Sequence, residues 1–369
     1  MPTAAAPAIH ARETPAIQAT HARALRIWLS VIAALVFAMI LVGGATRLTD
    51  SGLSITEWQP ILGAIPPLTD AAWQDAFEAY QKIPEYTHVN PDMTLDAFKS
   101  IYWWEWAHRF LGRIIGIAFF IPFVTFWAAG YIPRPLLPRL AGLFLLGGLQ
   151  GVVGWYMVKS GLVDRVDVSQ YRLAAHFGIA VLILGYILWL LLGLGRRPHT
   201  NDARTAGGAA WIAALLLALI FLQMLAGALV AGLDAGFGFN TWPLINGAFM
   251  PSGLGEASPW YLNLFENPLT VQFNHRMLGY AIVLATLAQL LWLAARAWGS
   301  SLAISALVVA FAALLQATIG VWTLLLKVPI ELGLAHQAGA IAVFAAGVYH
   351  FWLASGGPSP IVRQAAARA

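Results

Sequence analysis

Long apolar runs separated by polar connections dominate the pattern of hydrophobic and polar positions along the chain. A run of about 20 apolar residues is long enough to cross a bilayer as a helix. The pattern predicts eight membrane-spanning helices, over residues 25–47, 103–128, 138–160, 171–194, 208–232, 269–294, 301–326 and 331–354. It also predicts a disordered tail over 1–24, a linker over 195–207 and a second tail over 355–369. The expected fold class is an all-α integral membrane protein.

An internal repeat relates the first four predicted helices to the last four. Six residues recur 184 positions later, namely Gly43, Asp50, Gly52, Trp58, Gly63 and Pro67 as Gly227, Asp234, Gly236, Trp242, Gly247 and Pro251. Further along, the matched positions are His108-Arg109 with His275-Arg276, Gln150 and Gly154 with Gln316 and Gly320, and His176 with His336. Four helices per repeat is an even number, so both halves enter the membrane the same way. We therefore expect two parallel-repeat four-helix bundles, residues 25–194 and 208–354, related by a pseudo-twofold axis along the membrane normal.

The charge distribution predicts the orientation of these helices. With 59% hydrophobic residues, 10% charged residues and a mean hydropathy of +0.71, the chain does not belong to the soluble classes. The side that carries both termini holds only two acidic residues, Glu13 and Asp202, against eleven arginines: Arg12, Arg23, Arg26, Arg134, Arg139, Arg196, Arg197, Arg204, Arg296, Arg363 and Arg368. The positive-inside rule then places both termini in the cytoplasm, as a multi-pass protein of the cell inner membrane. The basic pI of about 9.4 thus reflects topology, and no nucleic-acid binding is expected.

The chain has no cysteine. This excludes disulfides, iron–sulfur ligation, thiolate metal sites and the covalent attachment of c-type haem. Any metal or haem must be held by histidine or oxygen ligands.

Four histidines lie near the outer ends of predicted helices, within about two turns of each end: His108, His176, His275 and His336. Within each half the two histidines are expected at similar depth, where opposed imidazoles can ligate a haem iron from both faces. A single histidine near a helix end is more often interfacial than a ligand, but the recurrence of both pairs favours ligation. The remaining histidines have no repeat partner and are expected to be solvated or interfacial: His10, His21, His88, His199 and His350.

Two glycines follow the histidines by four residues, Gly112 after His108 and Gly279 after His275. Because positions four apart share a helix face, each imidazole is expected to project over a patch without side chains, against which a flat ring system could lie.

Arginines adjoin both histidines of the repeated motif. Arg109 and Arg276 are costly at a membrane edge unless paired, so they either reach the lipid headgroups or bind haem propionates. Arg113, one turn deeper, is assigned to a buried ion pair or to a propionate without a choice between them.

One carboxylate distinguishes the two halves. Glu105 lies three residues before His108 on the same helix face, and its counterpart beside His275 is the neutral Gln272. A carboxylate at the rim of a porphyrin could act as a base, activate water or stabilise positive charge. The alternative is an interfacial carboxylate that faces water, and spacing alone does not decide between the two.

The first outer loop, about 48–102, is long and rich in aromatic residues. Residues 70–82 can form an amphipathic helix with Trp73, Phe77 and Tyr80 on one face, for which we expect a position on the membrane surface. Asp50 and Asp234 are expected to end helices and turn the chain. Gln150 and Gln316 are expected to be interhelical hydrogen-bond donors.

Together these residues resemble the haem A synthase family, over essentially the whole chain after the N-terminal tail. The resemblance rests on Glu105-x-x-His108-Arg109-x-Leu111-Gly112, on the second His-Arg-x-x-Gly from His275 to Gly279, and on His176 and His336. It implies oxidation of the C8 methyl group of haem O to a formyl group, giving haem A for cytochrome oxidase assembly, with water as the expected oxygen source.

The resemblance also implies roles for individual residues. Haem b would be bound by His275 and His336 with Arg276 beside it, and the substrate haem by His108 and His176 with Arg109 and Arg113. Glu105 falls on the essential glutamate of the family. Many bacterial members carry a cysteine pair in the first outer loop, so its absence here resembles the alphaproteobacterial and mitochondrial-like branch. Haem O is the implied substrate; haem O synthase, cytochrome oxidase assembly factors and a second copy of the chain are partners left open.

Two other classes use similar features. A di-haem b electron carrier linked to quinol could use the same four histidines, but it predicts haems at different depths in the membrane. A duplicated secondary transporter predicts broken helices or charges at the membrane midplane. All four histidines lie on the outer side, which disfavours the electron carrier, and the charges concentrate near the outer helix ends, which disfavours the transporter.

Overall fold

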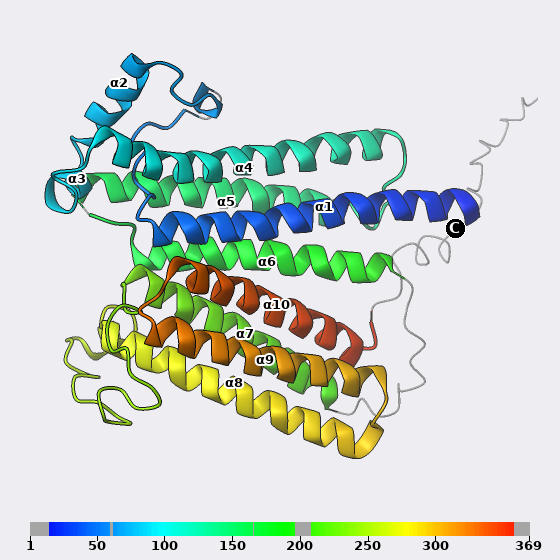
Figure 1. The fold of residues 1–369 in the computed structure, drawn as a ribbon. Coiled ribbons are helices and arrows are strands. Elements are labelled where there is room, and N and C mark those ends of the chain that lie inside the picture. The colour runs from blue at the N-terminus through cyan, green and yellow to red at the C-terminus, as the bar shows by residue number, and fades with distance from the viewer. Residues whose placement is uncertain (1–14, 60–61, 165, 196–207, 358–369) are drawn as a thin grey trace, which may run out of the picture.

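Long helices running side by side make up most of the molecule, as Figure 1 shows. The computed structural model describes residues 15–59, 62–164, 166–195 and 208–357, and within them it contains helices but no strand. Eight of the described helices are long and apolar enough to span a membrane: α1 Pro15–Leu48, α4 Leu95–Ala128, α5 Leu137–Asp164, α6 Gln170–Leu194, α7 Ala209–Gly232, α8 Pro268–Ala297, α9 Ser301–Leu325 and α10 Ile330–Ala354. The predicted all-α membrane fold is confirmed.

The helix boundaries differ from the prediction mainly at two starts. α1 begins at Pro15, inside the segment predicted as a disordered tail, and α4 begins at Leu95 rather than at 103. The side chain of Thr94 caps α4 by accepting a hydrogen bond from the Ala97 amide, which explains the early start. Most of the predicted linker and C-terminal tail lies outside the described residues.

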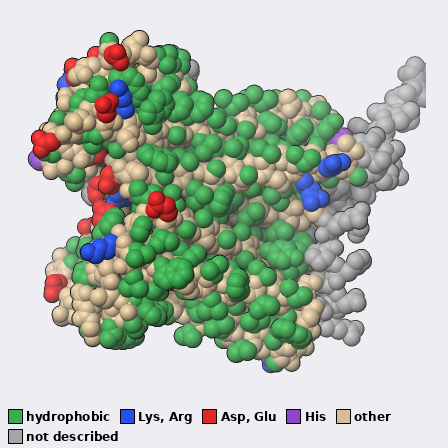
Figure 2. Space-filling model, viewed as in Figure 1, with side chains coloured by type: hydrophobic (Ala, Val, Ile, Leu, Met, Phe, Trp, Pro, Cys, Tyr) green, Lys and Arg blue, Asp and Glu red, His purple; other side chains and the backbone are tan. Residues whose placement is uncertain are grey.

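Contacts between helices of the two halves form the centre of the molecule. α1 and α6 of the first half pack against α10 of the second, and α6 also packs against α7. The α6–α7 contact is close because Gly232 lies against the backbone of Gln170, where an added Cβ would sit 2.7 Å from the Gln170 Cα. Figure 2 shows hydrophobic side chains covering the spans, while acidic side chains gather at the end that carries α2 and α3. This distribution is typical of a protein that lies in lipid.

A salt bridge joins the two halves at that end. Asp50 and Asp234, with φ of 47° and 52°, adopt the left-handed conformation just after α1 and α7, as predicted for residues that end these helices. Arg47 donates a 2.7 Å hydrogen bond to Oδ1 of each aspartate. The repeat-equivalent aspartates therefore share one arginine, a link that the sequence alone did not predict.

The first outer loop folds back onto the extended start of α4. It contains η1 (Leu62–Ala64), α2 (Asp70–Tyr80) and α3 (Pro84–His88), and the second half carries η2 (Trp260–Leu264). The predicted amphipathic helix is present as α2, with Trp73, Phe77 and Tyr80 buried on one face. That face packs against Phe98 and Tyr102 of α4, so the expected position on the membrane surface is wrong. The early start of α4 supplies the apolar surface that α2 covers.

The first outer loop contains a buried carboxyl group, that of Glu85 in α3. The Tyr80 hydroxyl donates a 3.1 Å hydrogen bond to Oε1 of Glu85, and Asn90 donates to the Tyr80 oxygen at 2.9 Å. Burial, together with the negative charges of Glu105, Asp50 and Asp167, raises the pKa of Glu85 to about 8, although the hydrogen bond from Tyr80 lowers it. Burial also raises the pKa of Tyr80.

The folded structure of α2 and α3 should therefore become less stable as the pH rises. Because the folded pKa of Glu85 lies above its ordinary value of 4.5, the folded state holds the proton more tightly, and its stability falls between that value and about 8. We expect hydrogen exchange in α2 and α3 to accelerate between about pH 5 and about pH 8 after correction for the intrinsic exchange rate. Glu85→Gln should remove this dependence, whereas the exposed Glu78→Gln should retain it. An identical pH response in the Glu85 variant would contradict the assignment.

Candidate functional site

The four predicted histidines come together as two pairs, one in each half. In the second half the ring centroids of His275 on α8 and His336 on α10 are 6.4 Å apart, at an interplanar angle of 78°. A metal ion bound to both rings by bonds of about 2 Å each would fit between them. In the first half, His108 on α4 lies within electrostatic reach of His176 on α6. Each pair thus draws its two imidazoles from two different helices.

Each histidine faces a glycine of a neighbouring helix. A Cβ added at Gly154 would lie 2.7 Å from Cε1 of His176, and one added at Gly320 would lie 2.6 Å from Cε1 of His336. The corresponding contacts of His108 and His275 are with two further repeat-matched glycines, Gly43 and Gly227. These glycines leave room for an imidazole ring between closely packed helices.

Glutamines on adjacent helices hold three of the four histidines. Gln150 donates to the backbone oxygen of His176 at 3.0 Å, and Gln316 donates to that of His336 at 2.7 Å. This confirms their predicted role as interhelical donors. Gln316 also lies 2.9 Å from Nδ1 of His336, which restrains the orientation of the ring.

Gln223 makes the equivalent contact with His275 and was missed from the sequence. It donates to the His275 backbone oxygen at 3.0 Å. Its repeat counterpart is Met39, so the two sequences do not match at this position. The glycines after the histidines lie against these two side chains, since a Cβ added at Gly112 would meet Met39 and one added at Gly279 would meet Gln223. The expected smooth patches beside the imidazoles are therefore covered by side chains.

Arg109 and Arg276 form matching clamps on the loops that follow α1 and α7. Arg276 donates to the backbone oxygens of Phe239 at 2.7 Å and Thr241 at 2.8 Å. Arg109 donates to the repeat-equivalent oxygens, those of Ile55 at 2.8 Å and Glu57 at 3.1 Å. Neither arginine is extended toward lipid headgroups in this arrangement. Their role toward a propionate stays a prediction.

Glu105 and Gln272 complete the two clamps with opposite hydrogen-bond polarity. Glu105 is 2% exposed, and its Oε2 accepts from Ser54 Oγ and from the Ile55 amide, both at 2.7 Å. Its Oε1 accepts from Arg109 at 2.6 Å. An ionised carboxylate offers about four acceptor positions, so one on Oε1 is left over. A carboxylate that simply faces water is excluded, because the group is buried.

Gln272 meets the opposite set of partners. Its Nε2 donates to the backbone oxygens of Ala235 at 2.6 Å and Gly238 at 2.8 Å, and its Oε1 accepts from Arg276 at 2.7 Å. The loop thus offers donors to Glu105 in the first half and acceptors to Gln272 in the second. Each environment matches the residue that occupies it.

Two other predicted residues require separate mention. Arg113 donates to the backbone oxygen of Gln59 at 3.0 Å, which ties a third point of the first outer loop to α4.

His350, expected to be solvated or interfacial, is instead 2% exposed, and its Nδ1 lies 2.8 Å from Ser305 Oγ. That expectation is wrong because the end of α10 packs against the start of α9. His21 stacks on Tyr131, His88 ends α3, and His10 and His199 lie outside the described residues.

The described residues contain no group of three or more histidine, aspartate or glutamate side chains that could hold a metal ion. What the arrangement offers is paired imidazoles from different helices, beside the hydrogen-bonded arginines Arg109 and Arg276, near one end of the spans. Fold and site therefore define a multi-span helical membrane protein with a duplicated bis-histidine site.

Comparison with known proteins places the chain within that class. Residues 26–348 match the family model described as cytochrome oxidase assembly protein. The chain is 55% identical to the haem A synthase of Parvibaculum lavamentivorans over 91% of this chain and 96% of that protein. It is 50% identical to the haem A synthase of Agrobacterium fabrum over 89% of this chain and 90% of that protein. The chain belongs to the haem A synthase family.

The close glycine contacts should be needed for the histidine geometry. In Gly320→Ala the new methyl group would push the His336 ring away from its hydrogen bond with Gln316, so we expect the purified protein to retain less haem. Gly148→Ala is the matched control, because a Cβ there meets nothing within 4 Å. Alanine is the better helix former by about 1 kcal/mol, so the control should be at least as stable as the original chain. Equal haem content and visible spectra in both variants would contradict this reading of Gly320.

Proposed function

We propose that the chain is a haem A synthase that oxidises the C8 methyl group of haem O to a formyl group. The second half binds a resident haem b through His275 and His336, and the first half binds haem O through His108 and His176. The product is haem A for cytochrome oxidase. Family membership supports the biosynthetic role, and the site geometry supports the division of labour between the halves.

The observation that carries the proposal is the pair of matching clamps, of which one holds the charged Glu105 and the other the neutral Gln272. The second half fixes its loop with the neutral Gln272, so a negative charge is not required for that structural task. The first half nevertheless holds the carboxylate of Glu105 in a buried place, which costs desolvation energy. A group that is not needed for the fold and costs energy to bury is a candidate for chemistry.

A second observation supports a resident haem in the second half. Arg276 is 9% exposed and forms no ion pair with any described carboxylate, and its Nε has no hydrogen-bond partner among the described residues. Arg109 in the first half is neutralised by Glu105. A buried cation without a counter-ion is unfavourable, and a haem propionate would supply the missing negative charge. Haem b bound there by His275 and His336 supplies one-electron redox chemistry.

A third observation favours the first half as the substrate site. Over the most apolar 18 residues of each span, 6% of the residues are buried in α4 and 6% in α5, against 22% in α8 and 39% in α9. Gly147 lies two turns from Gly154 on the same face of α5, and a Cβ there would meet nothing within 4 Å. Its repeat counterpart, Ala313, is 5% exposed. The first half thus offers exposed helix surface against which the isoprenoid chain of haem O can lie, whereas the second half is more closely packed.

Glu105 has a defined part in this reaction. Each hydroxylation of the methyl carbon would add the oxygen of one water and release two protons and two electrons, and a haem b held by His275 and His336 would pass these electrons one at a time to a one-electron acceptor outside the chain. After the second hydroxylation, loss of water from the geminal diol leaves the formyl group. The charge of Glu105 stabilises positive charge that develops on the carbon, and the remaining acceptor position of Oε1 can take a proton. Ser54, the Ile55 amide and Arg109 hold the carboxylate in one orientation.

The surroundings of the reaction follow from the same proposal. The protein lies in the cell inner membrane with both termini in the cytoplasm and the histidines toward the periplasm, as the arginine distribution predicts. Haem O would arrive from haem O synthase, and haem A would pass to the cytochrome oxidase assembly machinery. A di-haem electron carrier would not need one packed half and one open half, or a carboxylate in one clamp alone.

Replacement of Glu105 should separate catalysis from haem binding. Glu105→Gln places an amide among three donors and removes the negative charge, so we expect haem A formation to fall by about a hundredfold or more. Haem b should stay bound, because its proposed ligands are in the other half. His275→Ala should instead lose the resident haem. Extracted haems identified by mass give both readouts, and a normal yield of haem A in Glu105→Gln would remove Glu105 from the mechanism.

Filling the open space in the first half should affect substrate alone. Gly147→Leu introduces a side chain where the isoprenoid chain is proposed to lie, and overpacking typically costs about 1–3 kcal/mol. We expect the amount of haem O and haem A bound per chain to fall by about tenfold, with haem b unchanged. Gly148→Leu, on another face of α5, is the matched control. An equal loss of haem O in both variants, or none in either, would contradict the placement of the chain.

A further inference from the structure

A concave site lies at the end of the molecule opposite α2 and α3. Its volume is about 280 Å³, and its walls come from α1, α6 and α10. Leu188, Leu191, Leu192 and Ala345 form an apolar wall, while Arg26, Ser30 and Tyr349 contribute the polar groups. The site is far from the histidine pairs. On α10, Tyr349 lies next to His350, which follows His336 by 14 residues. At 1.5 Å per residue this is about 21 Å.

Arg26 lacks a counter-ion among the described residues. It forms no ion pair and no hydrogen bond there. The acidic residues expected on this side, Glu13 and Asp202, lie outside the described residues. Arg26 is exposed beside leucine side chains at the end of the spans that is expected to face the cytoplasm, where an anionic partner is favourable, and its planar donors match a phosphate.

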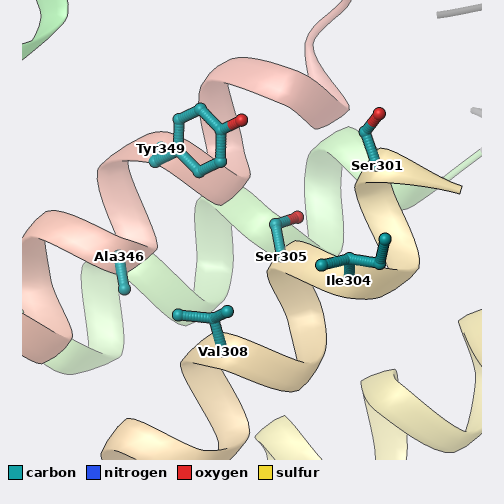
Figure 3. A pocket seen from close by; sticks show the side chains of 6 residues that line it. All are labelled: Ser301, Ile304, Ser305, Val308, Ala346 and Tyr349. Carbon is teal, nitrogen blue, oxygen red and sulfur yellow. The ribbon is translucent and has the colours of Figure 1, made fainter.

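A second concavity adjoins the first across Tyr349. It has a volume of about 320 Å³ and lies between α9 and α10, where Ser301, Ser305 and Tyr349 line it with Ile304, Val308 and Ala346 (Figure 3). Tyr349 lines both sites. Two mainly apolar hollows on either side of one polar residue suit an amphiphile with one anionic head and two chains.

We propose that Arg26, Ser30 and Tyr349 form a binding site for the phosphodiester head of an anionic phospholipid, with its acyl chains against the leucine wall and in the hollow between α9 and α10. Arg26 binds the phosphate oxygens, and the Tyr349 hydroxyl donates to them. The expected orientation places this end in the cytoplasmic leaflet, where basic pockets between helices are typical lipid sites. Because α1 and α6 belong to the first half and α10 to the second, the lipid stabilises the contact between the halves.

The test compares lipids with the same acyl chains and different heads. Purified protein in neutral detergent is titrated with phosphatidylglycerol, phosphatidylcholine or inorganic phosphate while its unfolding temperature is measured, and retained lipid is identified by native mass spectrometry. Phosphatidylglycerol should raise the Tm and remain bound to the original chain. Phosphatidylcholine should have a much smaller effect, and inorganic phosphate none.

The variants identify the site. Arg26→Gln should weaken the apparent affinity for phosphatidylglycerol by about fivefold to tenfold, and Tyr349→Phe should weaken it less. Arg23→Gln is the matched control, because Arg23 is an exposed arginine of the same helix that does not line the hollow. Each variant is compared with its own Tm before lipid is added, so a general loss of stability does not enter the result.

Four outcomes would overturn the proposal. They are an unchanged affinity in Arg26→Gln, an equal loss in Arg23→Gln, an equal response to phosphatidylcholine, and stabilisation by inorganic phosphate alone. The last would indicate a free-anion site.

Discussion

The hydrogen-bonded arginine clamp is the interaction on which the site depends. In each half an arginine next to a histidine donates two or more hydrogen bonds to backbone oxygens of the loop that follows the first helix of that half. Buried backbone oxygens at the membrane edge require donors, and a guanidinium satisfies several at once. The clamp thereby fixes the loop, the histidine helix and the residue at the Glu105 or Gln272 position relative to one another.

Duplication has preserved the clamps while their chemistry has diverged. Ser54 and the Ile55 amide present donors in the first half, whereas the oxygens of Ala235 and Gly238 present acceptors in the second. The first half therefore accommodates a carboxylate and the second an amide. The consequence for charge is that Arg109 is neutralised within the protein and Arg276 is not. One scaffold thus places two histidine pairs in different electrostatic surroundings, as the proposed substrate and cofactor sites require.

The two ends of the molecule hold the halves together in different ways. At the end with the acidic side chains, Arg47 bridges Asp50 and Asp234, which occupy equivalent turns after α1 and α7. At the opposite end, Arg26 has no described partner, and the hollow beside it spans α1, α6 and α10. Exposed ion pairs contribute little each, so the close helix contacts between the halves, such as Gly232 against Gln170, must supply most of the cohesion.

The sequence by itself determined the eight spans, the repeat and the four histidines. Membrane helices need long apolar runs, and a repeat is recognised by identical residues at a constant spacing. The sequence also located Glu105 as the residue that distinguishes the halves. Only the tertiary structure decided whether that carboxylate faces water or is buried, because burial depends on Ser54 and Ile55, some 50 residues away in the chain. The partner of His275 was hidden for a similar reason, since Gln223 has no identical counterpart in the first half. The apolar face of α2 was recognisable from the helical spacing of its hydrophobic residues. What that face packs against was not, because an apolar helix face is equally suited to lipid and to α4.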